Sequence, residues 1–155
     1  KVNDMTVQGS ESIIYNGEEY SFYEFPLEPY ISNKGIKFDA PHTGCWRGYY
    51  GTWLVEDNAL YLVDLRAVID INKPRCFPKF EKVALDYLFP NQDKVFAEWF
   101  SGKIHLPYGN MIPSYFRVYE KNIVLEFVSG KLVASHIEDN THLYNEKKET
   151  DDLPF

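Results

Sequence analysis

Short stretches in which apolar and polar residues alternate, each followed by a turn signal, run through most of the chain. A two-residue period is typical of a strand with one buried face. The pattern predicts a hairpin over 12–27, turned at Asn16-Gly17, because both of these positions accept a positive φ. It also predicts strands over 46–55 and 60–68, joined by a turn at 56–58.

The second half of the chain continues in the same way. Its alternation predicts four strands, over 94–106, 115–119, 123–128 and 132–137. Polar pairs at Lys121-Asn122 and Ser129-Gly130 are expected to turn the chain between the last three strands. A loop is expected over 107–113, because prolines stand at both of its ends.

One segment has a different period. Apolar residues at 80, 83, 84, 87 and 88 follow the 3.6-residue repeat of a helix, and Pro90 would end it. A short helix is therefore expected near 80–88. The stretch over 30–44 is expected to be a connection.

Together these elements predict a mainly β protein, with an α+β fold as the alternative. We expect seven or eight mostly antiparallel strands in a meander, a sandwich or a partly closed barrel. The chain has 155 residues, of which 45% are hydrophobic and 17% aromatic, as expected for one globular domain rich in strands. The prediction is a single domain over 1–138, followed by an acidic tail over 139–155 that docks on it. No apolar run approaches the ~20 residues of a membrane-spanning helix.

Negative charge is concentrated at the two ends of the chain. The formal net charge is −7, and residues 34–138 are almost neutral, with 13 bases and 12 acids. Six acids precede Lys34, namely Asp4, Glu11, Glu18, Glu19, Glu24 and Glu28. A chain of this charge lacks the basic surface that a phosphate backbone requires, so direct nucleic-acid binding is disfavoured. The acidic ends are either solvated segments or a face for a basic partner.

No motif in the sequence marks a catalytic, metal or cofactor site. Phosphate-binding loops, zinc-protease motifs and nucleophile elbows are absent. Cys45 follows His42 by three residues and precedes Arg47, so a Cys–His enzyme is an open alternative. Cys76 has no close partner in sequence, and whether it pairs with Cys45 stays open. Sparse cysteines favour a reducing cytoplasm, with export after loss of a leader as the alternative.

Aromatic residues are dense between 46 and 116 and serve either as core or as a binding surface. Tyr49 and Trp53, with Arg47, are the candidate anchors of an interface, since such interfaces favour these residue types. Exposed rings would equally suit a small ligand or a carbohydrate, which stacks on aromatic faces.

Several short motifs resemble a family of small, uncharacterised bacterial proteins. They are Cys45-Trp46-Arg47-Gly48-Tyr49, Thr52-Trp53, Leu60-Tyr61-Leu62, Leu88-Phe89-Pro90, Val95-Phe96-Ala97-Glu98-Trp99-Phe100-Ser101-Gly102 and Pro107-Tyr108-Gly109. The resemblance covers most of residues 12–133. It implies no activity and identifies no catalytic residue.

The leading hypothesis is a non-enzymatic protein-binding module. Small acidic bacterial proteins of one domain often serve as immunity proteins for secreted toxins, which is an analogy of size and charge. The specific expectation is an immunity protein that masks a basic toxin, such as a nuclease. The expected contact residues are Glu18, Glu19, Glu24, Glu28, Asp139, Glu146, Asp151 and Asp152, with Arg47, Tyr49 and Trp53 at the centre. The alternatives are a small-ligand or carbohydrate-binding β domain and an enzyme that depends on Cys45 and His42.

Overall fold

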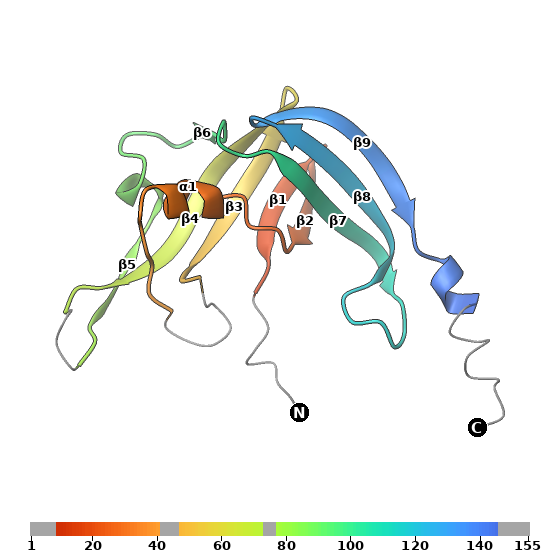
Figure 1. Ribbon diagram of the computed structural model, residues 1–155, viewed down its shortest axis with the longest axis horizontal. Helices are drawn as coiled ribbons and strands as arrows, with labels where there is room; N and C mark the ends of the chain where they lie inside the picture. Colours follow the sequence, from red (N-terminus) through yellow and green to blue (C-terminus); the bar gives the residue numbers. More distant parts are fainter. Residues whose placement is uncertain (1–8, 41–46, 73–76, 146–155) are drawn as a thin grey trace.

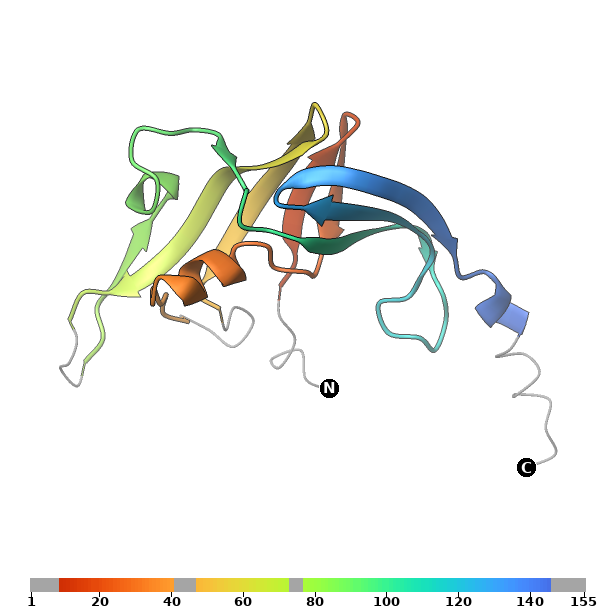
Figure 2. The same cartoon turned by 45° about the horizontal axis from the view of Figure 1, so that its top comes forward.

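The computed structural model describes residues 9–40, 47–72 and 77–145, and nine strands of this part form one curved, mixed sheet (Figures 1 and 2). The mainly β prediction is confirmed. The strands are β1 (Glu11–Tyr15), β2 (Glu18–Phe22), β3 (Tyr49–Glu56), β4 (Ala59–Asp70), β5 (Phe80–Val83), β6 (Val95–Phe96), β7 (Gly102–Met111), β8 (Tyr119–Val128) and β9 (Lys131–Asp139). The α-helix α1 (Glu28–Asn33) and the 3-10 helix η2 (Leu85–Tyr87) complete these elements.

The main path of the sheet runs β2-β1-β3-β4-β9-β8-β7. Most neighbours are antiparallel, but β1 and β3 pair in parallel, with Ser12 opposite Thr52 and Ile14 opposite Leu54. The short strands β5 and β6 lie along the same edge of β4 that β9 reaches. The path has β2 and β7 at its ends, so the sheet is curled without closing into a barrel.

Three predicted turns are confirmed, and all of them use residues with positive φ. Asn16 and Gly17 have φ values of 51° and 80°, as a two-residue hairpin turn requires. The β3–β4 turn places Asp57 and Asn58 in the left-handed region, and the β8–β9 turn does the same with Ser129 and Gly130. Local residue chemistry was sufficient to predict these positions.

The prediction of a helix near 80–88 is wrong for the first half of this segment. Residues 80–83 form β5, which pairs with the end of β4 from Ala67↔Val83 to Asp70↔Phe80. Only Leu85–Tyr87 make a helical turn, of the 3-10 type. Pairing with β4 outweighs the 3.6-residue period of residues 80–88. Over one short segment, such a period gives only a weak preference for a helix.

The α-helix instead occupies part of the stretch that was expected to be a connection. Pro29 stands in its first turn, where a missing N–H costs nothing, so this proline is compatible with the start of α1. The Tyr30 ring packs at 5.0 Å from Phe89 and 4.7 Å from Trp99. The Trp99 indole N–H donates to the carbonyl of Pro26 at 2.7 Å. Packing therefore holds a helix that is too short to be stable alone.

Three other expectations about the second half are corrected. The predicted loop over 107–113 and the turn at Lys121-Asn122 lie largely within strands, because β7 and β8 pair continuously from Gly102↔Phe127 to Tyr108↔Lys121. The strand expected over 94–106 is divided into β6 and β7 by a turn in which the Phe100 N–H donates to the Ala97 carbonyl. Pro107 is accommodated within β7, opposite Asn122.

The core lies on the inner side of the curved sheet and receives residues from β1 to β8. Its largest fully buried side chains are Trp53, Tyr49, Phe22, Phe127, Ile13, Leu27, Leu60, Leu62, Leu65, Ile104, Leu106 and Ile112. Strand β9 adds only the partly buried Leu132 to this cluster. Strand β9 is therefore held in place mainly by its pairing with β8.

The first residues of the acidic tail follow β9 and form hydrogen bonds with Glu120 of β8. The Asn140 N–H donates to the Glu120 carbonyl at 2.8 Å, and the Tyr144 hydroxyl donates to the Glu120 carboxylate at 3.0 Å. Residues 146–155 lie outside the described residues, so docking of the tail stays a prediction. No helix in the described ranges is long and apolar enough to cross a membrane.

Gly130, in the turn between β8 and β9, connects this turn to β4 and to the segment before β7. Its N–H donates to the Phe100 carbonyl at 2.8 Å, and its carbonyl accepts from the Leu60 N–H at 2.9 Å. A Cβ at this position would lie 2.6 Å from the Ala97 carbonyl oxygen, which is closer than real Cβ atoms approach. Glycine is required here by close approach as well as by its φ of 81°.

Replacing Gly130 by alanine should destabilise the protein much more than the same change at Gly17. Both glycines have a φ near 80°, but nothing lies within 4 Å of a Cβ at Gly17. The two variants share the backbone strain and differ in the clash with Ala97. Urea unfolding should give Gly130→Ala a free energy of unfolding about 1–3 kcal/mol below that of Gly17→Ala. Equal losses would show that this contact is unimportant.

Candidate functional site

The described members of the predicted acidic contact set are distributed over several elements. Glu18 and Glu19 are exposed at the start of β2, whereas Asp139 ends β9 and accepts hydrogen bonds from the N–H and hydroxyl of Thr141. Glu24 contacts His105, with its carboxylate 2.6 Å from Nδ1 and 3.2 Å from the backbone N of that residue. Glu28 accepts a hydrogen bond from the Tyr49 hydroxyl at 2.8 Å. Glu146, Asp151 and Asp152 lie outside the described residues.

The three central anchors expected from sequence are inside the protein. Tyr49 and Trp53 are 0% exposed, and the Arg47 side chain is nearly buried. The two rings occupy the face of β3 that turns toward the core, so they are unavailable as surface anchors. This corrects the sequence-based expectation for all three residues, whose types suit an interface and a core equally well.

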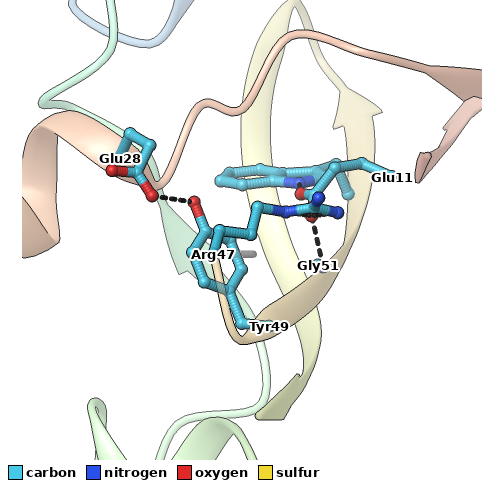
Figure 3. A network of polar contacts seen from close by, with 6 residues as sticks. Glu11, Glu28, Arg47, Tyr49 and Gly51 are labelled. Atoms are coloured by element: carbon cyan, nitrogen blue, oxygen red, sulfur yellow. Dashed lines mark hydrogen bonds and ion pairs between the residues drawn. The ribbon is translucent and has the colours of Figure 1, made fainter. Parts of the chain in front are cut away.

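These three residues surround a buried carboxylate, that of Glu11 at the start of β1 (Figure 3). Glu11 is 1% exposed and is the one charged residue among the described positions that is fully buried. Its Oε2 accepts from Arg47 Nη2 at 3.0 Å and from the Gly51 N–H at 2.9 Å. Its Oε1 accepts from the Trp53 indole N–H at 2.8 Å. The carboxylate thereby joins β1, β3 and the segment that leads into β3.

The geometry of β3 is adapted to this carboxylate. A Cβ at Gly51 would lie 2.7 Å from Glu11 Oε1 and 2.9 Å from the Trp53 indole nitrogen, so only glycine leaves room for both. The β3–β4 register shifts between Thr52 and Trp53, next to this glycine. The close approach of Glu11 gives a physical reason for a glycine beside this irregularity of the strand.

Burial raises the pKa of Glu11 above its ordinary value of 4.5, against the opposing effect of hydrogen bonds from Trp53 and Gly51 and the charge of Arg47. Removing a carboxylate from water costs several kcal/mol, and a charged, hydrogen-bonded partner offsets this cost. Arg47 also lies 4.1 Å from the centre of the Phe25 ring and 5.0 Å from that of Tyr50. The ion pair is therefore enclosed by aromatic rings.

The network extends to α1 through Tyr49. Burial, followed by the hydrogen bond to Glu28, raises the pKa of the Tyr49 hydroxyl far above its ordinary value, so this group remains a donor. Every buried side-chain nitrogen and oxygen of the described residues has a hydrogen-bond partner. A set of polar groups that satisfy one another has little left to offer a ligand, and we interpret this cluster as structural.

The exposed surface that the network helps to position lies at the tips of two hairpins. Because β1 and β3 are parallel and in register at Ile14↔Leu54, the β1–β2 and β3–β4 turns emerge side by side (Figures 1 and 2). Four exposed carboxylates flank these turns, and we call them the acidic tip surface: Glu18, Glu19, Glu56 and Asp57. Lys94 forms an ion pair with Glu56. Glu18 and Glu19 were predicted from the sequence as contact residues, whereas Glu56 and Asp57 from the second hairpin were not.

A hollow of about 530 Å³ lies along β3, β4 and β5. Its polar lining includes Tyr50, Asp64, Arg66 and Lys82, and Tyr50 is the only aromatic ring among its described lining residues. Aromatic rings are the groups on which a carbohydrate stacks. The hollow thus offers a sugar one ring for stacking.

The structure does not test the alternative of a Cys–His enzyme, because His42, Cys45 and Cys76 fall outside the described residues. Within 9–40, 47–72 and 77–145, no group of three or more His, Cys, Asp or Glu side chains is arranged to hold a metal ion.

Comparison with known proteins gives no further guide: no family profile, curated protein or solved structure matches the chain.

Removing either charge of the buried pair should destabilise the fold strongly. Glu11→Gln leaves the Arg47 guanidinium without its counter-charge, and Arg47→Met leaves a buried carboxylate, so each should lower the free energy of unfolding by about 3–5 kcal/mol. The double variant has no unpaired buried charge and should lose much less than the sum of the single losses. Denaturant unfolding of the four proteins measures this coupling. Additive losses would contradict an energetically coupled pair.

Proposed function

We propose that the protein is a non-enzymatic protein-binding module that holds a basic partner on its acidic tip surface. The observation that supports the proposal is the meeting of two hairpin turns, which brings Glu18 and Glu19 next to Glu56 and Asp57. These acids come from segments nearly forty residues apart in the sequence. A functional surface assembled in this way depends on the fold, unlike a charged tail.

The acidic tip surface has the properties that favour association with a basic protein. Its carboxylates are exposed, and they stand on or beside tight hairpin turns. Clustered charge of one sign steers a partner of opposite charge and raises the association rate. Rigid turns also reduce the entropy lost on binding.

The specific form of this proposal is an immunity protein that masks a basic bacterial toxin. A nuclease is a fitting target, because its substrate-binding surface must be positive to hold phosphates. An acidic surface that covers such a site excludes the substrate, because its carboxylates pair with the basic residues that would otherwise bind the phosphates. The carbohydrate alternative has less support, since the hollow beside β4 carries a single ring.

Neutralising the acidic tip surface should abolish capture of the partner. We would immobilise the wild-type protein and the triple variant Glu18→Gln, Glu19→Gln, Asp57→Asn, and pass a lysate of the source bacterium over each. A basic protein should be retained by the wild type and released by added salt. With that protein purified, the triple variant should associate at least about tenfold more slowly at low salt. Glu56 is left unchanged because it pairs with Lys94.

A matched control changes the net charge by the same amount elsewhere. Asp64, Glu81 and Asp86 are exposed near β4 and β5, away from the hairpin tips. The variant Asp64→Asn, Glu81→Gln, Asp86→Asn should bind like the wild type. If both triple variants lose the partner equally, overall charge and not the tip surface is responsible. If no basic protein is retained at low salt, the proposal fails. The immunity form further requires the captured protein to be toxic alone and harmless when co-produced with this chain.

A further inference from the structure

The hollow along β3, β4 and β5 lies on the outer face of the sheet, opposite the core. Leu65 and Ala67 of β4 are buried on the inner face. Asp64, Arg66 and Val68 alternate with them along the strand, so their side chains lie on the outer face. All three line the hollow, and β3 and β5 flank β4 at this level (Figure 1). The outer face of β4 is therefore the floor of the hollow.

The walls of the hollow carry small residues beside Val68. The Gly48 carbonyl accepts a hydrogen bond from the Val68 N–H at 3.2 Å, on the side of β3. Ala84 follows β5 on the other side, in an extended conformation. Both residues line the hollow. Its volume of about 530 Å³ lies within the range of ~300–1,000 Å³ that is typical of small-molecule sites.

Two cations on neighbouring strands share this face. Lys82 of β5 stands opposite Val68, so Arg66 is its diagonal neighbour on β4. Diagonal positions of an antiparallel pair are about 7–8 Å apart, which is within reach of long side chains. The ammonium of Lys82 and the guanidinium of Arg66 can therefore contact the same group of a ligand.

Neither cation is in an ion pair with a carboxylate of the described residues. Asp64 lines the hollow two residues before Arg66, but no ion pair joins the two. Arg66 instead contacts the Tyr50 ring, whose centre lies 5.9 Å from the guanidinium carbon. Its N–H groups have no acceptor in the described part of the chain, so they are accessible to solvent or to a ligand.

We propose that the hollow binds a small organic anion, whose carboxylate or phosphate group is held by Arg66 and Lys82. A guanidinium presents its N–H groups as a fork that matches two oxygens of either group. Lys82 adds a second positive charge. The carbon part of the ligand lies against Val68 and Ala84, because burial of apolar surface there favours an organic anion over a bare inorganic ion.

The anion site shares no residue with the acidic tip surface, so the two proposals can fail separately. Arg66→Gln should bind the basic partner like the wild type. The triple variant Glu18→Gln, Glu19→Gln, Asp57→Asn should bind the anion like the wild type.

An NMR titration of the full chain with four small probes tests the proposal. Benzoate and phenyl phosphate carry the two candidate groups on the same ring, benzamide has the ring without the charge, and inorganic phosphate has the charge without the ring. At least one of the first two should shift the amide signals of residues 64–68 and 82–84. It should bind about fivefold or more tightly than benzamide and inorganic phosphate. The tighter of the two identifies the anionic group.

Four exposed positions provide the variants. Arg66→Gln and Lys82→Gln should each weaken binding of the anion about fivefold or more, because each removes a charge-assisted hydrogen bond. Lys79→Gln is the matched control, since it removes an exposed positive charge from the same hairpin but outside the hollow, and it should bind like the wild type. Asp64→Asn removes a negative charge from the lining and should tighten binding about twofold or more.

The proposal is overturned if neither benzoate nor phenyl phosphate shifts these signals at the highest concentration reached, or if the shifts fall only elsewhere on the chain. Equal binding of benzamide would show that the charge is unimportant, and equal binding of inorganic phosphate would show that the apolar lining is; either result contradicts the proposed ligand class. An equal loss in Lys79→Gln and Lys82→Gln would make net charge, and not the hollow, responsible.

Discussion

The structure depends on the burial of one carboxylate, that of Glu11, between β1 and β3. An ionised group inside a protein costs several kcal/mol unless donors surround it, and here Arg47, Gly51 and Trp53 supply them at 2.8–3.0 Å. A register slip of one residue would turn Glu11 away from these donors and leave their N–H groups unpaired in the core.

The parallel pairing of β1 with β3 is consistent with this constraint and accounts for the position of the acidic tip surface. A two-strand hairpin such as β1–β2 is marginally stable alone, so its position must be fixed by contacts with the rest of the sheet. Ser12 to Ile14 pair with Thr52 to Leu54 beside the buried ion pair, and the two turns then emerge together. A buried polar cluster thereby helps to assemble the acidic tip surface.

Local chemistry in the sequence was enough to predict the turns and the mainly β fold, but not the contacts between distant segments. Asn16-Gly17 specifies its turn through residues that tolerate positive φ. Glu11 was counted with the exposed acids, because a charge at the edge of a strand pattern usually lies in water, and its donors are 36–42 residues away. One signal in the sequence pointed to the burial of Glu11: it lies on the same face of the strand as Ile13, and that face is buried. The segment over 80–88 was misassigned for the same reason, since pairing with β4 decides its structure.

Amide hydrogen exchange followed by NMR tests the central claim most directly. If the Glu11 carboxylate holds β1 against β3, the Gly51 amide and the Trp53 indole N–H open only when the whole domain unfolds. Their exchange free energies should then equal the free energy of global unfolding measured with denaturant. Exchange of both groups at a much lower free energy, comparable to that of the hairpin turns, would show that the contact opens locally and does not hold the fold together.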